Sequence, residues 1–267
     1  MATQNAAVES AGGEVVAFSD ANSTWEPGAL AALAAAFDDP AVGFAAGRVH
    51  FSDPVGDNEE GVYWRYEMWV RELESRLGGI TAGNGGIYAT RRSAYRFLEP
   101  SRSHDLSFPF ELRKDGWRSV DVPEARAHEK MVPTIEGEFA RKRRMMVGLP
   151  DIVIADRMWD PRGYGVLFGY QILSHRLLRY ASPLLHVATF GSNLLLLRRG
   201  RIYRLALAAQ AGLLLAAAIG DSAPGEVGRL TRIARYYVLV TASIALGFWD
   251  RCRNGPPAAW EKSEGTR

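Results

Sequence analysis

The 267-residue chain contains a single cysteine, Cys252. One thiol cannot form an intrachain disulfide, and the sequence has none of the paired cysteines that bind structural zinc. These absences exclude a disulfide-stapled secreted domain and a zinc-finger protein, and they favour a cytosolic setting for the main domain.

Other features are also missing. There is no large excess of charge, because 32 Lys and Arg residues are balanced by 30 Asp and Glu residues, so nothing global indicates a nucleic-acid binder. Residues 1–20 lack the basic and apolar regions of a signal peptide. Repeats are absent, and low complexity is confined to the alanines of residues 29–36. Because 47% of the residues are hydrophobic, the chain can bury a core.

No uncharged apolar run reaches the roughly 20 residues that span a bilayer comfortably. After residue 180, three shorter stretches contain no Asp, Glu, Lys or Arg, at residues 181–197, 205–220 and 236–249. Flanking arginines could lengthen these spans by snorkelling: Arg198, Arg204, Arg235 and Arg251. We predict membrane helices within 181–253, after an interfacial linker or helix at 151–180 and before a tail at 254–267. A buried helical hairpin in a soluble domain is the alternative.

The orientation of these helices is poorly fixed, because basic residues lie on both sides of the first stretch. Two spans, with the first stretch lying at the interface, satisfy the positive-inside rule better than three. The sequence therefore predicts a multi-pass protein of the cell membrane, in contact with lipid, with its main domain in the cytoplasm.

Residues 1–150 alternate strand-like and helix-like segments, which predicts an α/β layer fold. Residues 15–19 should be a buried strand, and residues 42–51 the next strand. Pro27 between them occupies a position favoured in a first helical turn, and apolar residues follow at helical spacing.

A second helix is indicated by an apolar stripe, which we interpret as core packing: Tyr66, Trp69, Val70, Leu73 and Leu77. The glycines of residues 83–86 then indicate a tight loop. A strand at residues 87–90 and a helix from about Ser93 should follow.

Asp20 and Asn22 come directly after the first strand, and the carboxyl ends of strands are where open α/β sheets bind ligands. Two oxygen ligands spaced in this way suit Mg²⁺ or Mn²⁺ holding a diphosphate. An Asx-turn or a helix cap is the alternative.

Asp105 follows His104 and precedes a helical segment at residues 106–114. It is predicted to be either a general base for an acceptor hydroxyl or a plain N-cap. Glu111 and Asp115, further along, have the pattern of surface charges.

Arg141 and Arg144 share one face of a helix that begins after Thr134. They could hold a diphosphate through paired hydrogen bonds. A solvated basic patch, or one that faces lipid headgroups, is the alternative.

The order of these segments resembles the processive and membrane-bound members of glycosyltransferase family 2. VVAFSDANSTWEPGALAAL is similar to the family's strand, D-x-D or D-A-N motif and helix, and TAGNGGIYATRRSAY to its glycine-containing acceptor-side segment. SHDLSFPFELRKDGWRSVDVPEARAHE resembles the block with the family's acidic base, and EFARKRRMMVG its Q/R-x-x-R-W helix. The resemblance covers roughly residues 5–262. It implies an incomplete GT-A, Rossmann-like domain at residues 1–150, followed by membrane helices.

The resemblance also implies roles for particular residues. Asp20 and Asn22 would bind the metal and the diphosphate of a nucleotide sugar, and Asp105 would be the acceptor base. The residues implied to contact the diphosphate or the acceptor are Arg141, Arg144, Gly85 and Gly86. Three positions depart from the family pattern: Asn22 replaces an Asp, His104 replaces an acid, and Met145 replaces a Trp.

Nothing in the sequence corresponds to the family's first strand, helix and acidic loop, which recognise the nucleotide. We expect this to leave an unpaired sheet edge, and we expect the chain alone to be inactive. The implied reaction is inverting transfer of a hexose from a nucleotide-diphosphate sugar to a hydroxyl of a lipid-linked or polysaccharide acceptor, with a divalent metal as cofactor. A non-catalytic membrane relic, or a scaffold for a complete transferase, is the alternative.

Overall fold

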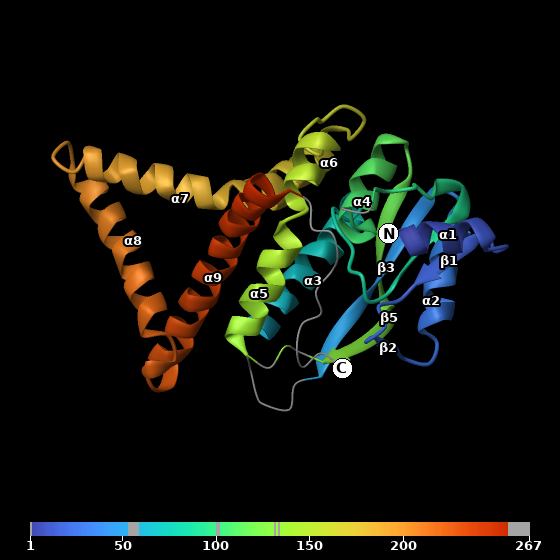
Figure 1. The fold of residues 1–267 in the computed structure, drawn as a ribbon, viewed down its shortest axis with the longest axis horizontal. Coiled ribbons are helices and arrows are strands. Elements are labelled where there is room, and N and C mark those ends of the chain that lie inside the picture. Colours follow the sequence, from blue (N-terminus) through green and yellow to red (C-terminus); the bar gives the residue numbers. More distant parts are fainter. Residues whose placement is uncertain (1, 53–58, 100–101, 131, 133, 256–267) are drawn as a thin grey trace.

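The computed structural model describes residues 2–52, 59–99, 102–130, 132 and 134–255. A sheet covered by helices forms one end of the molecule, and an arm of three long helices, labelled α7, α8 and α9, extends from it (Figure 1). The strands are β1 (Val15–Phe18), β2 (Thr24–Trp25), β3 (Val42–Ser52), β4 (Tyr88–Arg91) and β5 (Arg118–Lys130). The helices are α1 (Ala2–Ser10), α2 (Ala29–Ala35), α3 (Glu59–Leu77), α4 (His104–Lys114), α5 (Ile135–Met146), α6 (Val166–Gln171), α7 (Leu178–Leu195), α8 (Arg201–Ile219) and α9 (Gly225–Asn254), with π-helical segments at Asp151–Ala155 and Ile172–Leu177.

The sheet is mixed, and its strand order is β1-β4-β3-β5-β2. The pairs β1–β4, β4–β3 and β5–β2 are antiparallel, whereas β3 and β5 are parallel. Ala89 of β4 lies opposite Ala17 of β1 on one side and Ala45 of β3 on the other. It follows that β1, β3 and β5 run in the same direction, so their carboxyl ends lie at one edge of the sheet.

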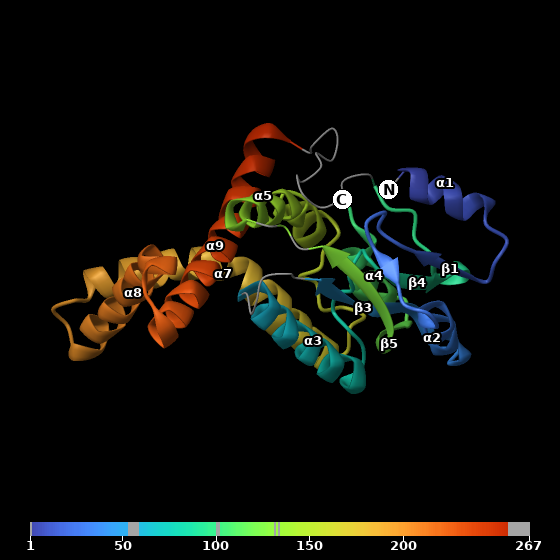
Figure 2. The same cartoon turned by 90° about the horizontal axis from the view of Figure 1, so that it is seen from below.

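The core occupies both faces of the sheet, because successive side chains of a strand point to opposite sides. Ala45 of β3 packs in a buried cluster with Leu33 of α2. Its neighbour Phe44 packs on the other face with Val8 of α1 and Phe108 of α4. Figure 2 shows α1 and α2 on opposite sides of the strands. The predicted α/β layers, the helix after Pro27 and the long strand at residues 42–51 are therefore confirmed.

The strand predicted at residues 15–19 is present as β1, but it is not fully buried. Val15, Val16 and Phe18 are half-buried and Ala17 is exposed. The reason is its place at the edge of the described sheet, where β4 is its one paired neighbour. The open edge that the resemblance implied is therefore present among the described residues.

The apolar stripe of α3 does not pack into the core, so that prediction was wrong. Its exposed members are Tyr66 at 52%, Trp69 at 59%, Leu73 at 38% and Leu77 at 57%. The buried face of the helix is charged instead: Glu67, Arg71 and Glu74 are at most 8% exposed.

Ion pairs make the burial of these charges possible. Arg71 pairs with Asp121 of β5 at 2.7 Å. Glu67 and Glu74 both lie within ion-pairing distance of His175, at 3.3 and 2.7 Å. Buried charges are tolerated when they are paired, so the apolar side of α3 is left outside.

The helix expected from about Ser93 is only a 3₁₀ turn, Arg92–Ala94. Tyr95 then adopts an extended backbone, which places its ring 5.3 Å from that of His104 and 5.4 Å from that of Phe108. The next two predicted helices are confirmed as α4 and α5. Thr134 caps α5 as expected, because its side chain accepts a hydrogen bond from the Gly137 amide at 3.1 Å.

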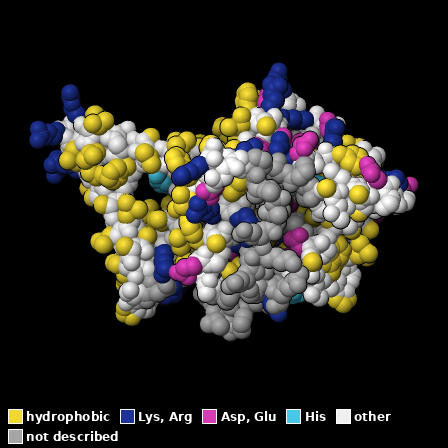
Figure 3. All heavy atoms as spheres, in the orientation of Figure 1, with side chains coloured by type: hydrophobic (Ala, Val, Ile, Leu, Met, Phe, Trp, Pro, Cys, Tyr) yellow, Lys and Arg dark blue, Asp and Glu magenta, His cyan; other side chains and the backbone are white. Residues whose placement is uncertain are grey.

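The three apolar stretches after residue 180 lie in α7, α8 and α9, but only α8 is long and apolar enough to cross a membrane among the described residues. No residue of α8 is buried. Figure 3 shows hydrophobic side chains over the arm and Lys and Arg side chains at its tip. A multi-pass location is therefore not supported.

The third stretch differs because α9 packs against protein. Ile244 is 2% exposed, and a side chain on Gly247 would lie 2.8 Å from the carbonyl carbon of Met146 in α5. Asp250 pairs with Arg143 of α5 at 2.6 Å. The C-terminal half of α9 therefore packs against α5 of the same chain.

Residues 149–180 contribute to a third buried cluster. It joins Phe110 of α4, Ile152, Phe168, Tyr180 and Ile244 of α9. The cluster runs across the predicted boundaries at residues 150 and 180, and the division of the chain into domains at these points stays a prediction.

Candidate functional site

Asp20 lies just beyond the end of β1, in a turn closed by a hydrogen bond from the Ser23 amide to the Asp20 carbonyl at 3.1 Å. Asn22 is exposed within this turn. Glu129 stands near the end of β5, at the same edge of the sheet, and accepts a hydrogen bond from the Ser23 hydroxyl. The turn is thereby joined to β5.

The loop before β4 packs closely against these carboxylates. A Cβ on Gly85 would lie 2.9 Å from Oδ2 of Asp20, and a Cβ on Gly86 would overlap with Oε1 of Glu129. Neither glycine has a positive φ. Glycine is needed here for close approach rather than for an unusual backbone conformation. The Trp25 indole donates to the Gly86 carbonyl at 3.1 Å and holds the loop in place.

Asp105 lies in the first turn of α4, two residues beyond the cap position, which Ser103 occupies. Its carbonyl accepts a hydrogen bond from the Gly83 amide at 2.7 Å, so the glycine loop also contacts the start of α4. Burial raises the pKa of the Asp105 carboxyl, while the Ser103 hydroxyl, the amides of residues 105 and 106 and the charge of Arg176 act in the opposite direction. A carboxylate with a raised pKa is better suited to accept a proton near neutral pH.

The charges of Glu129 and Asp105 act on the carboxyl of Asp20. Burial raises the pKa of Asp20 to about 6, and the charges of Glu129 and Asp105 add to this effect. Asp20 is exposed to solvent, and its carboxyl lies against the glycine loop, where a Cβ on Gly85 would come within 2.9 Å of Oδ2. A cation at this position would relieve the repulsion.

His104 has a structural role beside Asp105. It is 1% exposed, and its ring nitrogens lie 2.7 Å from the Tyr88 hydroxyl and 3.1 Å from the Tyr95 hydroxyl. Burial lowers the pKa of His104 to about 4, so the ring is neutral at physiological pH. It anchors the start of α4 between the two tyrosines.

Arg141 and Arg144 lie on α5. Arg141 pairs with Glu138 at 2.7 Å, and Lys142 pairs with the same carboxylate at 2.8 Å. The roles of Arg141 and Arg144 at the diphosphate or the acceptor stay predictions. Glu111, expected at the surface, is partly buried, and burial raises its pKa to about 7.

The sequence did not single out Glu129 as a site residue. It ends the block that resembles the acidic-base segment, and the signal that would have identified it is an acid at the end of a strand. The direction of that strand relative to β1 was needed to bring it next to Asp20, and the sequence does not give strand directions.

The side chains at this site could bind a divalent metal only if phosphate oxygens of a substrate supplied some of its ligands. In the described part of the chain, no three His, Cys, Asp or Glu side chains are arranged to hold a metal by themselves. Mg²⁺ and Mn²⁺ commonly use one or two carboxylates and take their other ligands from water and phosphate oxygens. The Asp20 carboxyl, whose pKa is raised by burial and by the charges of Glu129 and Asp105, matches such a site.

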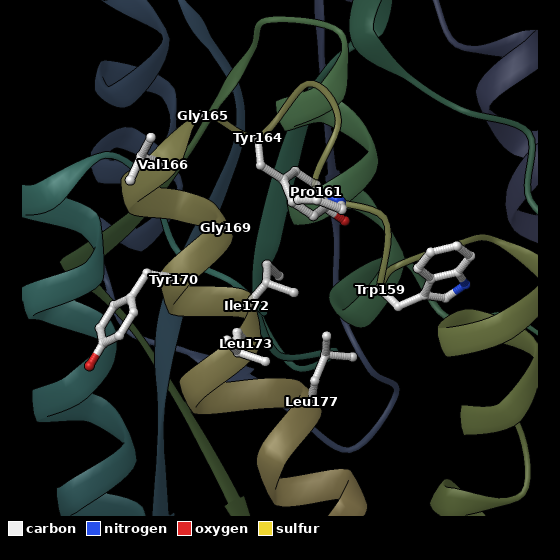
Figure 4. A pocket seen from close by; sticks show the side chains of 10 residues that line it. All are labelled: Trp159, Pro161, Tyr164, Gly165, Val166, Gly169, Tyr170, Ile172, Leu173 and Leu177. Atoms are coloured by element: carbon white, nitrogen blue, oxygen red, sulfur yellow. The ribbon is translucent and has the colours of Figure 1, made fainter.

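An apolar cavity of about 580 Å³ lies elsewhere, between the loop at Trp159 and the helical turn formed by α6 and residues 172–177. Figure 4 shows Trp159 on one side and Ile172, Leu173 and Leu177 on the other. None of the predicted site residues lines it. The chemistry indicated above is therefore not in this cavity.

Comparison with known proteins agrees with the fold. A family model described as "Glycosyl transferase family group 2" matches residues 15–221. Among solved structures, the chain is similar to "Mannosyltransferase PcManGT from Pyrobaculum calidifontis in complex with GDP-Man and Mn2+", with a TM-score of 0.61 and 18% sequence identity. The match covers 94% of this chain and 65% of that chain. No curated protein matches the chain by sequence.

Proposed function

Because the chain belongs to glycosyl transferase family group 2, we propose that it transfers a hexose from a nucleotide-diphosphate sugar to a hydroxyl acceptor, with inversion at the sugar carbon. The observation that carries this proposal is the approach of Asp20, at the end of β1, to Asp105, at the start of α4, across the glycine loop. Donor and acceptor chemistry would then occur at one edge of the sheet.

Asp105 is proposed as the general base. The acceptor hydroxyl gives its proton to the Asp105 carboxylate, and its oxygen forms a bond to the anomeric carbon. The bond between that carbon and the diphosphate oxygen breaks, and the electron pair leaves on the diphosphate. A single displacement of this kind inverts the configuration at the carbon.

Asp20 and Asn22 are proposed to hold Mg²⁺ or Mn²⁺. When bound, the metal would supply positive charge to the diphosphate, as expected for a donor whose leaving group gains charge. The Mn2+ and GDP-Man in the similar mannosyltransferase structure support this choice of ligands. Gly85 and Gly86 would let the diphosphate approach the backbone, and Arg141 and Arg144 are proposed to contact the diphosphate or the acceptor.

A membrane setting is also proposed, since α8 is apolar and wholly unburied. A lipid-linked or polysaccharide acceptor would suit a transferase held at the bilayer. Inactivity of residues 1–267 without a partner remains our expectation.

Asp105→Asn and Asp105→Ala test the assignment of the base. Asn keeps the shape of the side chain but accepts a proton poorly, so turnover should fall by roughly 10²–10⁴-fold. The assay measures nucleoside diphosphate release by the chain together with the partner or segment that completes its nucleotide-binding part, with Mn²⁺, a membrane lipid extract and a panel of nucleotide sugars that begins with GDP-mannose. Normal turnover in the Asn variant, or release from no donor in the wild type, would contradict the proposal.

A further inference from the structure

Arg176 connects the helical arm to the candidate site. It lies in the π-helical segment Ile172–Leu177, immediately before α7, and is 6% exposed. Its Nε donates a hydrogen bond to Oγ1 of Thr81 at 2.8 Å. Thr81 is completely buried and stands at the start of the loop that contains Gly85 and Gly86.

Two residues after Thr81, the Gly83 amide donates to the Asp105 carbonyl at 2.7 Å. Thr81 is also fixed from the other side, because its amide and its hydroxyl donate to the Glu74 carboxylate at 3.1 and 2.9 Å. The segment at residues 81–83 therefore joins Arg176 to the backbone of Asp105 through two hydrogen bonds, one at the buried Thr81 and one at the half-buried Gly83. Buried polar groups linked in this way resist displacement, since a lost partner is costly.

The neighbours of Arg176 fix the segment that carries it. His175 Nδ1 lies 2.7 Å from Glu74, and Arg179 pairs with Glu67. A π-helical turn shifts the direction in which successive side chains point, and such turns are frequent at functional sites. Here it directs His175 and Arg176 toward the buried face of α3.

Charged and titratable groups face Asp105 from several elements. Asp20 lies beyond β1, Tyr88 on β4 and His104 on α4, and Arg176 comes from the π-helical segment. His104 is neutral. Arg176 is thus a source of positive charge that favours the ionised form of Asp105, against burial and the charge of Asp20.

We propose that Arg176 is a positioning residue for the base: through Thr81 and Gly83 it fixes the backbone of Asp105, and with it the place from which the carboxylate accepts the acceptor proton. The inference rests on the proposed function, because it presupposes that Asp105 is the base. The packing of the segment before α7 against α3 is then required for catalysis, in addition to the membrane attachment proposed for α8.

The test compares Arg176→Gln, Arg176→Lys and Thr81→Val with the control Arg179→Gln in the whole protein. Arg179 lies on the same helical run but pairs with Glu67, so its loss should cost stability without acting on Asp105. Turnover is measured with the donor and extract that support the wild type, from pH 5.5 to 9. Hydrogen exchange of residues 81–87 and thermal unfolding are measured alongside.

Removing the Arg176 charge should move the acid limb of kcat/KM to higher pH, because the base then holds its proton more tightly. We expect the ratio of kcat/KM at pH 6 to that at pH 8 to fall by about threefold or more, which corresponds to about half a pH unit. Arg176→Lys should return the acid limb of kcat/KM to its wild-type pH. Thr81→Val should leave the pH of this limb unchanged but lower kcat. Exchange of residues 81–87 should accelerate in Arg176→Gln and Thr81→Val but not in Arg179→Gln.

An unshifted limb together with unchanged exchange in Arg176→Gln would overturn the inference, as would equal shifts in Arg179→Gln. A failure of the proposed function would be recognised by a different result, namely normal turnover in Asp105→Asn. In the Asp105→Asn background, where residual turnover is still measurable, adding Arg176→Gln should cause no further loss of turnover. A further loss would show that Arg176 acts independently of Asp105 and would contradict the inference.

Discussion

Gly86→Ala is the most direct perturbation of the candidate site. A Cβ at this position would overlap with Oε1 of Glu129 and would lie 2.8 Å from both Ser23 Oγ and Val49 Cγ2. These atoms belong to β5, to the turn after β1 and to β3. Movement of the Glu129 side chain alone would not clear the other two contacts, so the loop itself must shift.

The size of the effect follows from these contacts. Inserting one methyl group into a packed site costs about 1–3 kcal/mol. Displacing Glu129 would also strain its hydrogen bond with Ser23, a type of bond that contributes about 1 kcal/mol or more. We therefore expect a loss of about 2 kcal/mol, which for a protein of this size lowers Tm by roughly 4–8 °C. Because Asp20 is in the same turn as Ser23, binding of the nucleotide sugar that supports turnover should weaken as well.

Thermal unfolding by calorimetry measures the first effect, and titration of the nucleotide sugar that supports turnover, in the presence of Mn²⁺, measures the second. Gly12→Ala is the matched control, since a Cβ there would meet nothing within 4 Å and its φ is not positive. Gly85→Ala should fall between the two, because its closest contact is the end of the Asp20 side chain at 2.9 Å. If Gly86→Ala matched Gly12→Ala in both measurements, the close approach of the glycine loop to the carboxylates would be refuted.

Two further changes test other parts of the structure. Burial raises the pKa of Glu111 to about 7, so the free energy of unfolding should decrease as pH rises from about 4.5 to 7. At pH 8, Glu111→Gln should therefore be more stable than the wild type by on the order of 1–2 kcal/mol after allowing for solvent screening. Equal denaturant midpoints of the two proteins at pH 8 would contradict this. Leu214 and Leu215 of α8 are 53% and 64% exposed. Replacing both with Lys should release the protein from carbonate-washed membranes without lowering its Tm. Retention of the variant in the membranes would argue against α8 as the anchor.

Part of the site could be predicted because the signal lies in short stretches of sequence. Asp20 follows a strand as predicted, whereas Asp105 lies within the first turn of α4 and not just before the helix. Glu129 was missed because its approach to Asp20 depends on β1 and β5 running in the same direction with two strands between them. Short-range patterns identify the end of a strand but do not determine which strands share an edge.

Arg176 was missed for a different reason. The sequence around it is part of an apolar run with scattered basic residues, which was interpreted as an interfacial linker or helix. A π-helical turn changes the spacing at which side chains share a face, so an argument from a 3.6-residue period assigns His175 and Arg176 to the wrong direction. Its partner Thr81 is also 95 residues away.

The error on α3 shows what periodicity does and does not determine. The stripe of Tyr66, Trp69, Leu73 and Leu77 was correctly placed on one helical face, but a period gives a face and not its direction. Burial of the opposite face follows from its partners, since Glu74 binds both Thr81 and His175 while Arg71 pairs with Asp121. These partners come from three distant segments, and together they satisfy charges that α3 alone would have to expose. An apolar stripe is therefore evidence for the core only when the opposite face has no such partners to bind.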